Sequence, residues 1–91
     1  MNARALSPEL EYALSAIAEA KMHLLLTAQG TRPGTPERRA ELLKLIICTQ
    51  EARRYVDETI GGLSKLPVPV AVILMACEKG IDCLNREANL H

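Results

Sequence analysis

The chain has 91 residues, 48% of them hydrophobic, and its 11 Lys and Arg balance its 11 Asp and Glu to a formal net charge of zero. This length indicates one small domain, and the balanced charge provides no overall field to attract nucleic acid or an anionic membrane. With no Phe, no Trp and 2 Tyr, the core must be largely aliphatic, which favours a helical bundle over a β-sandwich.

A first helix is expected over residues 8–29. Ser7 is suited to cap it, Pro8 to its first position and Glu9 to its first turn, while Gly30 is suited to end it. Apolar residues recur at spacings of three and four along the segment, which predicts one buried face. That face comprises Leu10, Ala13, Leu14, Ile17, Ala20, Leu24 and Ala28.

A second helix is expected over residues 36–60, after the short loop GTRPGTP. Thr35 is a suitable N-cap, Pro36 fits the first helical position, and Gly61 or Gly62 can supply the left-handed residue that ends the helix. Its predicted buried face comprises Leu42, Leu45, Ile46, Thr49, Ala52, Val56 and Ile60.

A third helix is expected over residues 69–88, because Pro67 and Pro69 interrupt any continuation of the second. Residues 70–77 are rich in β-branched side chains, but the rest of the chain offers no strand to pair with them. Gly80 costs this helix about 1 kcal/mol relative to Ala and indicates a bend, a close helix contact or a tolerated defect. The predicted buried face comprises Val70, Ile73, Leu74, Cys77, Ile81, Leu84 and Ala88.

Three helices joined by short connectors predict an all-α, three-helix, up-down-up bundle. We expect a flexible N-terminal tail over residues 1–6 and a single helical domain over residues 7–91. The opening residues lack the apolar stretch of a signal peptide, and the longest apolar run is too short to span a bilayer. We therefore expect a cytoplasmic protein without a membrane partner.

The helices carry more apolar residues than one buried face per helix requires. The surplus predicts an intermolecular interface, most simply that of a homodimer, unless these residues are scattered over the surface or used within the bundle. Aromatic side chains often anchor protein interfaces, and Tyr12 and Tyr55 are the two aromatic residues of the chain. We therefore include Tyr55 in the candidate interface as an anchor. The candidate interface comprises Met22, Leu26, Leu43, Ile47, Tyr55, Val72 and Met75.

Residues that could carry chemistry do not form a recognisable motif. Cys48, Cys77 and Cys83 are odd in number and lack a CxxC spacing, and with His23 and His91 they match no standard zinc pattern. We expect three reduced thiols, no metal, no cofactor and no catalytic residue. Lys21 projects into the apolar face of the first helix, where a lysine usually extends its ammonium group to solvent. These features indicate a protein that is not an enzyme.

The one basic cluster lies on the second helix. Nearby acidic residues at spacings of three and four, such as Asp57 after Arg53 and Glu41 before Lys44, favour a solvated helix face. The alternative is a nucleic-acid contact formed by Arg38, Arg39, Lys44, Arg53 and Arg54.

The sequence as a whole favours a small helical protein acting through protein–protein contact, of the regulator, inhibitor, immunity-protein or chaperone type. Its first expected partner is a second copy of itself, and another protein is also compatible with the apolar surplus. Two alternatives remain: a nucleic-acid-binding regulator, and a binder of a small apolar ligand at the dimer seam.

Overall fold

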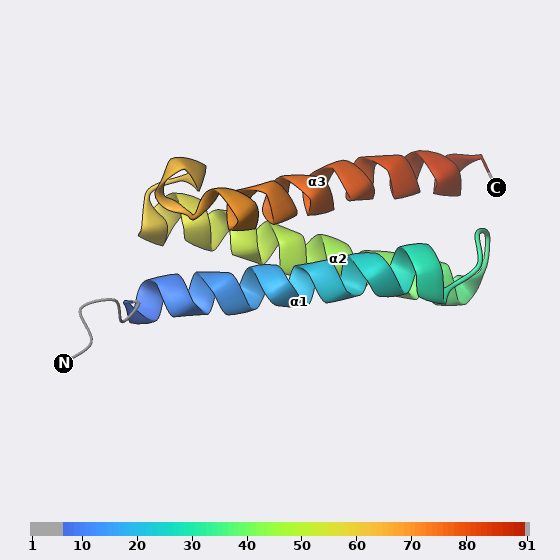
Figure 1. Ribbon diagram of the computed structural model, residues 1–91. Helices are drawn as coiled ribbons and strands as arrows, with labels where there is room; N and C mark the ends of the chain where they lie inside the picture. The colour runs from blue at the N-terminus through green and yellow to red at the C-terminus, as the bar shows by residue number, and fades with distance from the viewer. Residues whose placement is uncertain (1–6, 91) are drawn as a thin grey trace.

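The computed structural model describes residues 7–90, and every long element within them is a helix. Figure 1 shows α2 running antiparallel to both α1 and α3, which is the predicted up-down-up order. The predicted tail at residues 1–6 lies outside the described residues. The elements are α1 (Pro8–Gly30), α2 (Pro36–Tyr55), η1 (Val56–Ile60), η2 (Leu63–Lys65) and α3 (Val68–Asn89).

Both predicted N-caps are confirmed. The backbone N–H of Leu10 donates to Ser7 Oγ at 3.1 Å, and that of Arg38 donates to Thr35 Oγ1 at 3.1 Å. Each bond satisfies an amide that has no partner within its own helix. The two helix starts are therefore determined by residues next to them in the sequence.

The two predicted glycine stops differ in mechanism. Gly61 has φ 103°, and its N–H and that of Gly62 both donate to Val56 O at 2.9 Å, closing the π-helical turn η1 at the end of α2. Gly30 ends α1 but is not among the positive-φ glycines of residues 7–90. Thr31 leaves the helix instead, in an extended conformation with its hydroxyl donating to Thr27 O at 2.6 Å.

The core follows the predicted faces in two clusters along the bundle, with three differences. Ala28 and Ala88 are exposed because they lie near the helix ends, and Leu66 enters the core from the connector before α3. One cluster is formed by Ala13, Ile17, Ala52, Val56, Leu66 and Leu74. The other is formed by Ala20, Leu42, Leu45, Cys77 and Leu84. The chain measures 53 × 21 × 18 Å along its principal axes, so each helix runs beside its neighbours and keeps an outward face at the surface.

Gly80 marks a close approach of α3 to α1, one of the alternatives that the sequence left open. A Cβ atom built on Gly80 would lie 2.6 Å from Leu24 Cδ1. Glycine therefore leaves the space that Leu24 fills beside the second core cluster. The loss of helix propensity at Gly80 is compensated by packing between helices.

Candidate functional site

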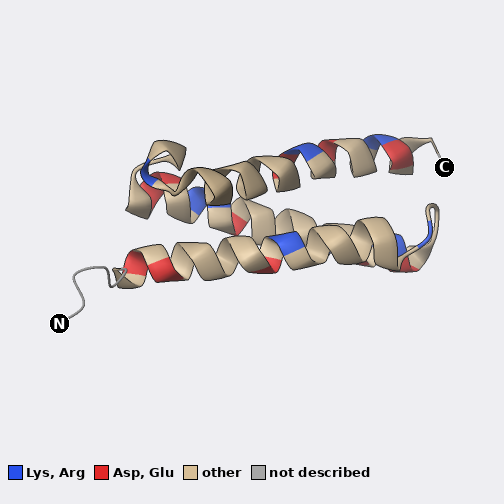
Figure 2. Ribbon diagram, viewed as in Figure 1, with Lys and Arg blue, Asp and Glu red and all other residues tan. Residues whose placement is uncertain are grey.

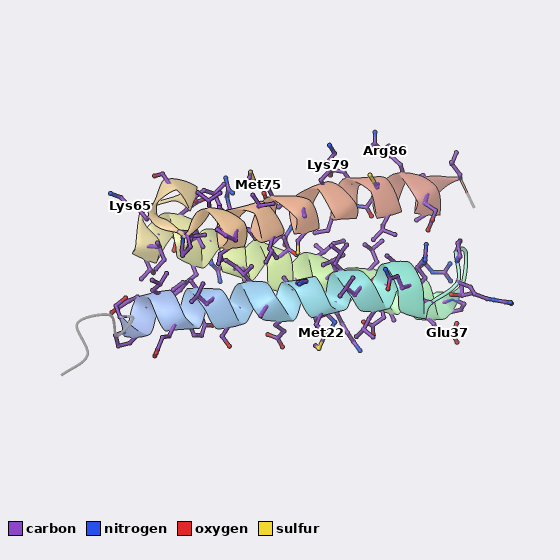
Figure 3. All side chains as sticks on the ribbon, in the orientation of Figure 1. Met22, Glu37, Lys65, Met75, Lys79 and Arg86 are labelled. Atoms are coloured by element: carbon purple, nitrogen blue, oxygen red, sulfur yellow. The ribbon has the colours of Figure 1, made fainter. Side chains whose placement is uncertain are left out.

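The surplus apolar residues are exposed as predicted, but they do not form one surface. Leu43 and Ile47 are 61% and 57% exposed on α2, and Val72 is 52% exposed on α3. Met22 and Met75 project from α1 and α3 on opposite sides of the bundle (Figure 3). Because each helix turns its surplus away from its own core face, the bundle separates these residues into three outward faces.

One of these faces follows α1. Ala18, Met22, Leu25 and Leu26 line a shallow open groove, which we call the α1 strip. Within the α1 strip, the side chains of Met22, Leu25 and Leu26 are 49%, 44% and 44% exposed. Leu25 is absent from the sequence-based set, although its spacing of three from Met22 was a usable signal. Lys21 borders the strip and is exposed, as predicted for a lysine that extends to solvent.

The two tyrosines stack on each other between α1 and the end of α2. Their ring centroids are 4.6 Å apart with planes tilted by 56°. Tyr55 is half-buried against the first core cluster, and burial, with smaller effects of Glu9 and Tyr12, raises its pKa. Tyr12 is 59% exposed. Of the two rings, Tyr12 therefore offers more surface to a partner, and Tyr55 packs against it from the side of the core.

The five basic residues of α2 are not gathered into one strip. Arg38 is buried, whereas Arg39, Lys44 and Arg54 are exposed. Arg53 pairs with Asp57 at 3.3 Å and with Glu78 of α3 at 3.5 Å.

Acidic neighbours offset much of this basic charge. Lys44 pairs with Glu41 at 3.3 Å. Arg54 borders an open groove that also contains Asp57, Glu58 and Asp82. Figure 2 shows the same mixture on α3, where acidic and basic residues alternate from Glu78 onward and residues 68–77 carry neither. A polyanion would meet carboxylates beside these cations.

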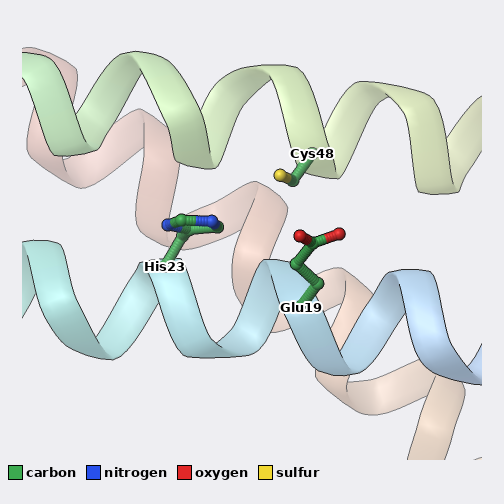
Figure 4. A group of neighbouring side chains, drawn as sticks. All are labelled: Glu19, His23 and Cys48. Carbon is green, nitrogen blue, oxygen red and sulfur yellow. The ribbon is translucent and has the colours of Figure 1, made fainter.

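A second group of polar side chains converges between α1 and α2. Glu19 and His23 project from α1 toward Cys48 of α2 (Figure 4), and one ligand atom from each lies within 4.8 Å of the other two. His23 Nδ1 also lies 3.3 Å from Glu41 Oε1. This group was not predicted from the sequence, because Cys48 is far from Glu19 and His23 along the chain and meets them only across the helix pair.

The electrostatic surroundings of the three cysteines differ. Burial raises the pKa of Cys48, and the nearby charges of Glu19 and Glu51 raise it further. Cys77 is fully buried, and its pKa is raised by burial and then by Glu78. Cys83 is exposed, and neither Cys77 nor Cys83 belongs to the group formed by Glu19, His23 and Cys48.

No protein-family model, curated protein or solved structure matches this chain. Within residues 7–90, none of the helices combines the length and hydrophobicity that crossing a bilayer requires.

Proposed function

We propose that this chain is a non-enzymatic helical protein that acts through protein–protein contact, with the α1 strip as its contact surface. The observation that supports this most is the continuity of Met22, Leu25 and Leu26, each 44% or more exposed in one groove. Soluble monomers rarely leave adjoining large apolar side chains in water. Covering the strip would remove that apolar area from water, which is the main source of association energy.

The proposed partner is a second copy of the chain, related by a two-fold axis across the strip. An apolar strip bordered by Lys21 and Gln29 can pair with itself, because the aliphatic side chains meet at the centre while the polar ones stay at the rim. Regulator, inhibitor, immunity-protein and chaperone roles all use contacts of this kind. A reducing cytoplasm suits the three free cysteines.

Nucleic-acid binding through α2 has less support. Arg38 is buried and pairs with Glu87, Arg53 pairs with two carboxylates, and Lys44 pairs with Glu41. Three of the five candidate cations therefore already have partners within the chain. An apolar ligand at a dimer seam would use the same α1 strip and presupposes the dimer.

The test is the absolute mass in solution, measured by light scattering after gel filtration over a hundredfold concentration range. The expected mass is twice the chain mass of 10.0 kDa at the upper concentrations. Met22→Lys places a charge in the strip and is expected to shift the chain to monomer. Val72→Lys, on the outward face of α3, is the matched control and is expected to leave the dimer intact. A wild-type monomer throughout the range would overturn the dimer, and dissociation by Val72→Lys alone would move the interface to α3.

A further inference from the structure

We propose that Glu19, His23 and Cys48 form a Zn²⁺-binding site that links α1 to α2. This inference contradicts our expectation from sequence that the chain binds no metal, and it is independent of the proposed dimer. It rests on the convergence of one carboxylate oxygen, one imidazole nitrogen and one thiol sulfur within 4.8 Å of one another.

Two features of the fold bring these residues together. Glu19 and His23 are four residues apart, so they occupy the same face of α1 one turn apart. Cys48 arrives from the antiparallel α2, because a helix pair folded about the loop at residues 31–35 brings residues near position 18 opposite Cys48. Figure 4 shows the three side chains directed into the space between the two helices.

The donor set and its dimensions suit Zn²⁺. Zinc binds Cys sulfur, His nitrogen and carboxylate oxygen at about 2.0–2.3 Å, so adjacent ligands of a tetrahedral site lie about 3.3–3.8 Å apart. The ligand atoms here lie within 4.8 Å of one another, so metal binding would require the side chains to rotate and bring these atoms closer together. The mixture of oxygen, nitrogen and sulfur favours Zn²⁺ over Ca²⁺ and Mg²⁺, which prefer oxygen ligands alone.

Glu41 acts as a positioning residue for His23. Its Oε1 lies 3.3 Å from His23 Nδ1, which leaves Nε2 as the nitrogen for the metal. Metal-bound histidines usually donate their second N–H to a carboxylate in this way, which fixes the ring and increases its basicity. Lys44 pairs with the other oxygen, Glu41 Oε2, at 3.3 Å and so holds the carboxylate in place.

The charge around the site favours a cation. Glu19, Glu41 and Glu51 place carboxylates around His23 and Cys48, and binding would add the Cys48 thiolate to them. Metal binding releases the thiol proton to solvent and forms the S–Zn bond. Glu19 is exposed, so the fourth coordination position faces solvent and would take a water molecule.

The test uses the metal-free full chain and titrates it with Zn²⁺ by calorimetry and with Co²⁺ by absorbance. We expect one metal ion per chain and a thiolate-to-cobalt charge-transfer band. Cys48→Ser should abolish the band and weaken Zn²⁺ binding at least tenfold, and Glu19→Gln should weaken binding in the same direction. Cys83→Ser is the matched control, because Cys83 is an exposed cysteine outside the cluster, and it should bind as the wild type does.

Glu41→Gln separates positioning from a purely structural role. It should weaken Zn²⁺ binding by about 10–100-fold, as for other partners of metal-bound histidines, while keeping the cobalt–thiolate band at saturation. A wild-type chain without bound metal would overturn the site. Equal losses of Zn²⁺ affinity in Cys48→Ser and Cys83→Ser would also overturn the site, as would a Cys48→Ser variant that binds Zn²⁺ with the wild-type affinity. Circular dichroism monitors the unfolding of each metal-free variant, and a cooperative transition shows that the variant is folded before its metal affinity is compared.

Discussion

The guanidinium of Arg38, in the first turn of α2, forms an ion pair with the carboxylate of Glu87, near the end of α3. The same guanidinium donates from Nη2 to the carbonyls of Ala28 and Thr31 at 3.0 Å each, and from Nε to Thr31 Oγ1 at 3.2 Å. Arg38 therefore joins all three helices at one end of the bundle. It also satisfies carbonyls at the end of α1 that have no partner within that helix.

Arg38→Ala is expected to lower the free energy of unfolding by about 2–4 kcal/mol. Removing one partner of a buried ion pair costs about 3–5 kcal/mol, and we reduce this range because the Glu87 side chain is 33% exposed. Urea unfolding followed by circular dichroism measures the change. Arg39→Ala, at the exposed neighbouring position, should stay within about 0.5 kcal/mol of wild type. Equal stabilities of the two variants would contradict the role assigned to Arg38.

The role of Arg38 also marks where reasoning from the sequence reaches its limit. The caps at Ser7 and Thr35 and the apolar faces could be predicted, because they depend on neighbours one helical turn away. Arg38 looked like one of several solvated cations, because its partner Glu87 is 49 residues further along the chain. The Cys48 cluster was missed for the same reason, since its ligands meet only after the helices are placed in register.

A double-mutant cycle at Gly80 and Leu24 tests the close approach of α3 to α1. Gly80→Ala alone gains about 1 kcal/mol of helix propensity but requires Leu24 to move, so a small net change is expected. In a Leu24→Ala background the space is free, and the same substitution should stabilise by about 1 kcal/mol. Thermal and urea unfolding of the four proteins give the coupling. An identical effect of Gly80→Ala in both backgrounds would show that Leu24 does not limit this position.

The raised pKa of Cys77 predicts a loss of stability at alkaline pH. Burial disfavours the thiolate in the folded chain, whereas the unfolded thiol ionises at its ordinary pKa of about 8.5. The neutral Cys77 thiol therefore makes its full contribution to the free energy of unfolding below the unfolded pKa. That contribution declines as pH rises from the unfolded pKa toward the higher pKa of the folded chain. The decline is at most about 1.4 kcal/mol per pH unit for one proton.

Cys77→Ala removes this titration and provides the comparison. Urea unfolding of both proteins from about pH 7 to about pH 10 should show their stability difference shrinking as pH rises. Cys83→Ser, a substitution at an exposed thiol, should keep a constant difference from wild type over the same range. A constant difference for Cys77→Ala as well would show that its folded thiol titrates like a free one.

The unequal burial of the three cysteines predicts an order of reaction with a thiol-specific reagent in the metal-free chain. Cys83 is exposed and should react first, while Cys48 is half-buried with a raised pKa and should react more slowly. Cys77 is fully buried and should react only when the bundle opens, so its rate should rise with urea. Mass spectrometry of digested samples assigns each rate to its residue. Added Zn²⁺ should slow the reaction of Cys48 and leave that of Cys83 unchanged, since only Cys48 belongs to the proposed metal site. Modification of Cys77 as rapid as that of Cys83 would contradict the packing of α3 against the second core cluster.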